Sequence, residues 1–239
     1  MSTFPWDAYL GGFNGGGKWK DAFDPSITEA KRLRDVSKYG IPQGSWGAWW
    51  GAEYGACYNA GMGLQLLFSD MHRTEVIRNL EFMLDNQCAP YQWGESFFGP
   101  KTKNDWTRPA ADLETWGLSF VKQSILETCV SVKTDGTVII GRGIPDNWLG
   151  EGSVVAWTNV RINGGKKLGF SITGEKGSVT LKLNGDIPGG KIVFDLPVFR
   201  NNTVSVEADG RSLKKDVAES GSIELPPYVK LVKVTLRNQ

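Results

Sequence analysis

The chain has 239 residues, of which 40% are hydrophobic and 22% charged, and its formal net charge is +1. This length can bury the core of one large domain or two ordinary ones. The composition excludes intrinsic disorder, and the neutral charge balance argues against a nucleic-acid-binding protein. We find no signal peptide and no apolar run of about 18 residues, so we expect no membrane partner, and the compartment stays open.

Tryptophans and charges divide the chain into two regions. Eight of the ten tryptophans precede residue 120. Residues 1–131 carry a net charge of −3, and residues 132–239 carry +4. A tryptophan-rich, mildly acidic region suits neutral polar ligands such as sugars, because indole rings stack on their apolar faces. The alternative is that these rings only fill a core.

The cysteines and the single histidine limit the chemistry. Cys57, Cys88 and Cys129 are an odd number at wide spacing, which predicts buried free thiols. One histidine excludes a metal site that needs two, and we expect His72 to be a surface residue. We therefore expect no metal and no cofactor.

The first region reads as helices joined by long loops rich in Gly and Trp. Apolar residues three and four apart, together with capping residues, predict four helices. They cover residues 25–39, 52–68, 70–87 and 112–129. Loops as long as those between them are usually functional in a compact domain.

After residue 131 the hydrophobic period changes to two. Short alternating runs are separated at regular intervals by Gly, Asn and Asp, which predicts an antiparallel β-sandwich. The fold class expected is therefore α+β with two domains, residues 1–131 and 132–239. The predicted strands are 137–140, 154–157, 167–173, 179–183, 191–196, 203–207, 222–225 and 229–236.

Two stretches combine aromatic rings with a carboxylate. In the first, Tyr91, Gln92 and Trp93 precede Glu95, and Trp106 and Arg108 follow it. Rings of this kind grip a pyranose, and such a carboxylate can hold a nucleophilic water or donate a proton. An exposed Glu beside aromatics is nevertheless common.

The second stretch is WGAWWGAEY, residues 46–54, in which Trp46, Trp49 and Trp50 precede Glu53. Glu53 stands at the start of a predicted helix, so its plainer role is a favourable interaction with the helix dipole. In both stretches the rings and the carboxylate lie in a loop that leads into a helix. Loops at one end of a helical barrel would bring the two stretches together.

Three motifs in order, YQWGESFFG (91–99), WTRP (106–109) and LETWGLSF (113–120), resemble the last helical hairpin of the six-hairpin glycosidase superfamily. The segment VIIGRGIPDNWL (138–149) resembles the link from that hairpin to a C-terminal β-domain. Members of the superfamily fold as α/α toroids of six helical hairpins. The resemblance implies that residues 1–131 form part of such a toroid, ahead of the β-sandwich.

The resemblance also implies a function. Glu95 matches the position of the general base, with Glu53 a candidate partner. It implies sugar subsites at Trp46, Trp49, Trp50, Tyr91, Gln92, Trp93 and Trp106, with Arg108 binding a hydroxyl.

A full toroid needs at least about 200 residues. We therefore expect the C-terminal part of a glycoside hydrolase acting on oligo- or polysaccharide, whose general acid lies in a preceding segment. Whether this chain is itself an enzyme stays open.

Two alternatives remain. One is a non-catalytic carbohydrate-binding or interaction protein derived from such an enzyme. The other is a truncated gene product that self-associates through exposed helical faces.

Overall fold

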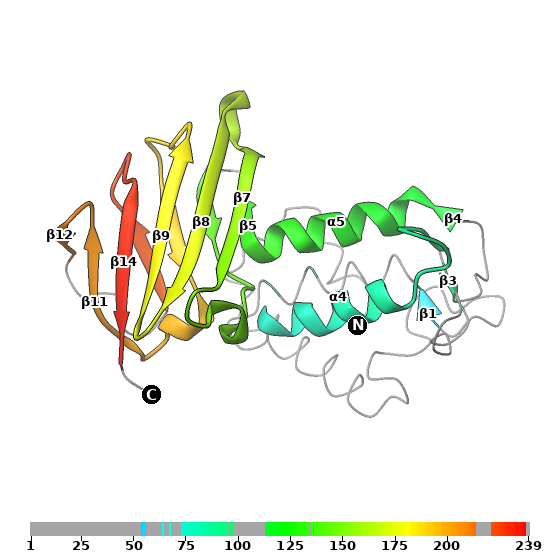
Figure 1. Ribbon diagram of the computed structural model, residues 1–239. Coiled ribbons are helices and arrows are strands. Elements are labelled where there is room, and N and C mark those ends of the chain that lie inside the picture. The colour runs from blue at the N-terminus through cyan, green and yellow to red at the C-terminus, as the bar shows by residue number, and fades with distance from the viewer. Residues whose placement is uncertain are drawn as a thin grey trace, which may run out of the picture. The chain divides into compact units, whose positions relative to one another are not determined.

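A computed structural model describes residues 54–55, 64, 67, 73–94, 96–97, 113–133, 135–213 and 221–237. The chain divides into two compact units, Met1–Thr128 and Cys129–Gln239. Figure 1 shows helices α4 and α5 in the first unit and a set of long strands in the second.

The described helices of the N-terminal unit pack against each other. α4 spans Val76–Asp85 after a 3-10 turn, η3 (Arg73–Glu75), and α5 spans Thr115–Cys129. Residues three and four apart share one face of a helix, and α4 and α5 each bury such a face. The resulting hydrophobic cluster contains Leu64, Leu67, Val76, Leu80, Met83, Trp93, Phe120 and Val121.

Two short antiparallel ladders join segments that are distant in the sequence. β1 (Tyr54–Gly55) pairs with β3 (Ser96–Phe97). β2 (Trp93–Gly94) pairs with β4 (Leu113–Glu114), which leads directly into α5. The segment that contains β2 and β3 is thus held on both sides.

The expected partial α/α toroid is wrong. Apart from the single helical residue Leu64, which lies within the helix expected over 52–68, the part of the chain that the structure describes holds two α-helices, of 10 and 15 residues, and most of its regular elements are strands. Part of the helix expected over 52–68 is strand β1. That segment contains Gly55, Gly61 and Gly63, and each glycine costs a helix about 1 kcal/mol relative to alanine. The helix expected over 25–39 lies outside the described residues.

A four-stranded sheet begins the C-terminal unit. Its strands are β5 (Val130–Val132), β6 (Val138–Ile140), β10 (Ile192–Asp195) and β13 (Ser222–Leu225). They are ordered β13-β10-β6-β5, and β10 runs parallel to β6 while the other pairs are antiparallel. The expectation of a purely antiparallel domain is therefore corrected to a mixed one.

A six-stranded antiparallel sheet forms the second layer of this unit, in the order β12-β11-β14-β9-β8-β7 (Figure 1). Alternate side chains of β8, those of Leu168, Phe170 and Ile172, are buried, as expected for a strand with one face toward the core. The strands are β7 (Val154–Arg161), β8 (Lys167–Glu175), β9 (Ser178–Gly185), β11 (Thr203–Ala208), β12 (Arg211–Ser212) and β14 (Leu231–Leu236).

Three 3-10 turns and a buried ion pair complete the C-terminal unit. The turns are η4 (Asp146–Leu149), η5 (Asn163–Gly165) and η6 (Pro197–Phe199). Arg142 donates to Asp195 across 2.7 Å, and the Asp195 side chain is only 2% exposed. The pair ties the segment after β6 to the end of β10.

Candidate functional site

The structure describes three of the sugar-site residues that the sequence predicts: Tyr91, Gln92 and Trp93. Tyr91 and Gln92 lie in the connection from α4 to β2, and Trp93 is the first residue of β2. The other predicted site residues are outside the described part of the chain, so their roles stay predictions: Trp46, Trp49, Trp50, Glu53, Glu95, Trp106 and Arg108.

Trp93 is a core residue of the N-terminal unit. Its side chain is 1% exposed, and its indole Nε1–H donates to the carbonyl oxygen of Met83 at 2.7 Å. A buried indole needs such a partner. In this structure the ring therefore anchors β2 to α4 and presents no open face to a sugar.

Tyr91 occupies a strained position in a tight turn. The Gln92 N–H donates to the Ala89 carbonyl oxygen at 2.9 Å, with Pro90 and Tyr91 between them. Tyr91 has φ 57°, and a positive φ at the second central residue of a turn normally calls for Gly or Asn. The Tyr91 N–H also donates to Oε1 of Gln87 at 2.5 Å.

The turn presents its aromatic ring to solvent. Tyr91 is 71% exposed, and Gln92 beside it is exposed as well. Strained backbone persists where the surroundings hold it, and it concentrates at functional sites. An exposed ring on a rigid turn can stack on a ligand with little loss of conformational freedom.

The β1–β3 ladder brings the two aromatic, carboxylate-bearing stretches together. In the β1–β3 ladder, Tyr54 is opposite Phe97 and Gly55 is opposite Ser96. Tyr54 directly follows Glu53 in the sequence, and Ser96 directly follows Glu95. Cα atoms of opposite residues in an antiparallel pair lie about 4.5–5.5 Å apart, so the backbones of both stretches meet here.

The structure also bears on metal ligands and cysteines. The described residues contain no group of three or more His, Cys, Asp or Glu side chains that could hold a metal ion. Cys88 is half-buried and Cys129 is buried, and both are free thiols. Burial raises the pKa of the Cys129 thiol, opposed by a hydrogen bond with Trp157. Cys57 and His72 are outside the described residues.

No described helix is long and apolar enough to cross a bilayer.

Sequence reasoning missed a pocket in the C-terminal unit. Its walls come from three turns that the sequence marks only as breaks between strands: Asp135–Thr137, Asn163–Lys166 and Pro188–Lys191. The glycines in these turns predict where the strands end, but nothing local shows that the turns converge. A clustering of Lys and Asn at several such turns is the one signal that could have drawn attention to it.

Comparison with protein-family models finds no match, and no curated protein matches the chain significantly.

Proposed function

We propose that the N-terminal unit binds a saccharide, with contacts from the two stretches 46–54 and 91–97. One observation carries the proposal. Strand β1, which begins directly after Glu53 in the sequence, pairs with strand β3, which begins directly after Glu95. In the sequence, each stretch contains aromatic residues and one carboxylate. Such groups suit a sugar, whose C–H faces stack on rings and whose hydroxyls donate to carboxylates.

Tyr91 lies within the part of the chain that the structure describes and is a candidate contact residue for the saccharide. Its ring is 71% exposed. One hydrogen bond, from the Tyr91 N–H to Gln87, ties the turn to the residues that follow α4, and a second, from the Gln92 N–H to Ala89, closes the turn itself. The Gln87 side chain that accepts from the Tyr91 N–H itself donates to the Leu84 carbonyl oxygen at 2.7 Å. The backbone that carries the ring is therefore held in place before a ligand arrives, which reduces the entropy lost on binding.

Titration of the full chain with neutral oligosaccharides tests this function, with tryptophan fluorescence or heat as the readout. Tyr91→Ala removes the ring, and we expect it to weaken binding about ten-fold, while Tyr91→Phe retains most of the affinity. The control is Trp148→Ala, read out by heat. Trp148 is also an exposed aromatic residue, at 38%, but belongs to the C-terminal unit and is not among the residues that line its pocket. Equal affinity of Tyr91→Ala and the wild-type chain would contradict the proposal.

Hydrolysis of the bound sugar is a separate step. The sequence resemblance predicts Glu95 as the group that activates water, and inversion at the anomeric carbon needs a second carboxyl on the other side of the bond. Release of reducing ends by the wild-type chain, abolished in Glu95→Gln with binding retained, would support that role. Binding without release is the result expected of a non-catalytic saccharide-binding protein.

A further inference from the structure

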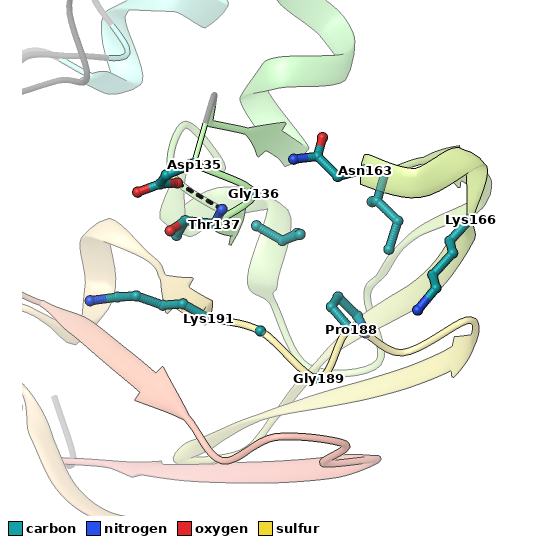
Figure 2. Close-up of a pocket in the computed structure, with 11 residues that line it drawn as sticks. Asp135, Gly136, Thr137, Asn163, Lys166, Pro188, Gly189 and Lys191 are labelled. Carbon is teal, nitrogen blue, oxygen red and sulfur yellow. Dashed lines mark hydrogen bonds between the residues drawn. The ribbon is translucent and has the colours of Figure 1, made fainter.

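The pocket of the C-terminal unit has the size and lining of a small-molecule site. Its volume is about 530 Å³, within the range of about 300–1,000 Å³ typical of ligand pockets. Its apolar part consists of Val138, Ile162 and Pro188, and the first two are buried. Asn163, Lys166 and the backbone of the Pro188–Lys191 segment supply its polar groups (Figure 2).

Two of the three charged residues that line the pocket have opposite charges beside them. Lys191 forms an ion pair with Glu224 at 2.6 Å. The Asp135 carboxylate accepts from the Thr137 N–H at 2.8 Å, and this bond, with lesser help from the charges of Lys133 and Lys191, lowers its pKa. Asp135 is therefore ionised at neutral pH and already compensated.

Lys166 differs from both. No carboxylate within the described ranges pairs with its ammonium. Figure 2 shows its side chain pointing toward the loop that contains Pro188 and Gly189, whereas Lys191 extends away from it. The ammonium group of Lys166 is thus a cation in the pocket lining that an anionic ligand could pair with.

Further possible donors lie on the Pro188–Lys191 segment, toward which Lys166 points. Among the described residues, no acceptor takes a hydrogen bond from the N–H of Gly189 or Gly190. On the opposite side, the Asn163 amide faces Gly136, where a Cβ added to the glycine would lie 3.0 Å from Nδ2. Backbone and ammonium donors suit a carboxylate, while the Asn163 amide and the Asp135 carboxylate suit hydroxyl groups.

We infer that this pocket binds a sugar acid of the uronate class. The carboxylate would pair with Lys166, the hydroxyls would bond to Asn163 and Asp135, and the C–H face would lie against Pro188, with the buried Val138 and Ile162 behind it. The choice of a sugar rests on the saccharide-binding function proposed above. The preference for a carboxylate rests on the pocket alone.

Titration of the ¹⁵N-labelled full chain with sodium glucuronate tests the inference by NMR. We expect shifts of the amides of Gly136, Gly164, Gly165, Gly189 and Gly190, which belong to the pocket turns. Glucose, which lacks the charge, and sodium acetate, which lacks the hydroxyls, are titrated at the same ionic strength. Each should bind at least about ten-fold more weakly than glucuronate.

Two variants test the role of the lysine. Lys166→Gln should weaken glucuronate binding about ten-fold or more, and Asn163→Asp should weaken it too by placing a second negative charge in the pocket. Lys176→Gln is the matched control, because Lys176 is an exposed lysine on the β8–β9 turn, away from the pocket lining. It should change the affinity less than about two-fold.

Three results would overturn the inference: pocket amides that do not move with glucuronate, equal affinity in Lys166→Gln, or acetate binding as tightly as glucuronate. Failure of the Tyr91 site is distinguishable from failure of this pocket. Loss of all Tyr91-dependent saccharide binding, with glucuronate shifts kept, refutes only the function of the N-terminal unit. Tyr91-dependent binding without those shifts refutes only the pocket.

Discussion

The two units of this chain hold their strands together in different ways. In the C-terminal unit β8 and β9 pair at eight positions, whereas the described residues of β1 and β3 in the N-terminal unit pair at two. A two-residue ladder contributes few hydrogen bonds and is marginal by itself. We therefore expect the fold around Tyr91 to depend strongly on side-chain packing, above all on Trp93 against α4, and the C-terminal unit to depend more on its continuous backbone ladders.

The largest expected effect is on the buried ion pair of the C-terminal unit. Asp195→Ala leaves Arg142 without its carboxylate and should lower the free energy of unfolding of this unit by about 3–5 kcal/mol. Hydrogen exchange of the β6 and β10 amides measures it. The control, Glu224→Ala, breaks the exposed pair with Lys191 and should cost about 0–1 kcal/mol. Similar losses in both variants would show that burial of the pair is unimportant.

A smaller effect is expected at Trp93. Trp93→Phe removes the indole donor to the Met83 carbonyl oxygen and should cost about 1 kcal/mol. The loss is limited because the Asn86 N–H also donates to that oxygen, at 3.3 Å. Exchange of the α4 amides is the readout, and it should change with little effect on β8 and β9.

The control for Trp93 is Trp148→Phe. Trp148 is 38% exposed on η4, so its replacement should change stability by less than about 0.5 kcal/mol. If Trp93→Phe left the exchange of α4 unchanged, the indole would not be the anchor between β2 and α4.

The smallest effect is a gain in stability at Glu127. Burial raises the pKa of its carboxyl above the ordinary value of 4.5, opposed by the hydrogen bond from Gln123. The folded state therefore binds the carboxyl proton of Glu127 more tightly than the unfolded state does. The stability gained from this proton is fully present below about pH 4.5 and is lost as the pH rises through the pKa of the folded state.

Glu127→Gln removes the ionisable group and with it the loss of stability at higher pH. In the wild-type chain Gln123 Nε2 donates to Glu127 Oε1 at 2.6 Å, and the amide oxygen of the variant can still accept this bond. We expect the variant to be more stable than the wild-type chain near pH 7 and to match it near pH 4, as measured by urea unfolding at both pH values. A gain that is larger in acid would contradict the assignment.

Local sequence patterns located many of the strands but not the helical architecture. Alternation at 167–173 and 179–183 predicts segments that lie within β8 and β9. The same reading expected a helix over 52–68, where Tyr54 and Gly55 form a strand. That strand exists because Ser96 and Phe97 pair with it, and a partner about 40 residues away leaves no mark on local periodicity.

The candidate site shows the same limit. Tyr91 and Trp93 are two residues apart and are both aromatic, so the sequence predicts the same role for both. Their exposures of 71% and 1% separate them. The difference arises because Trp93 faces the carbonyl of Met83 on α4, while the turn at Pro90 directs Tyr91 outward.

Local sequence pattern was sufficient to show where the hydrophobic period and the turn residues change, and hence the positions of most strands of the C-terminal unit, and composition alone showed that the first 120 residues are rich in aromatic residues. These features depend on neighbours a few residues apart. Only the tertiary structure decided that β6 and β10 run parallel, that Lys166 and the Pro188–Lys191 segment line one pocket, and that Trp93 is buried. Those properties depend on contacts between distant segments, whose register and approach are set by packing and backbone pairing and not by local composition.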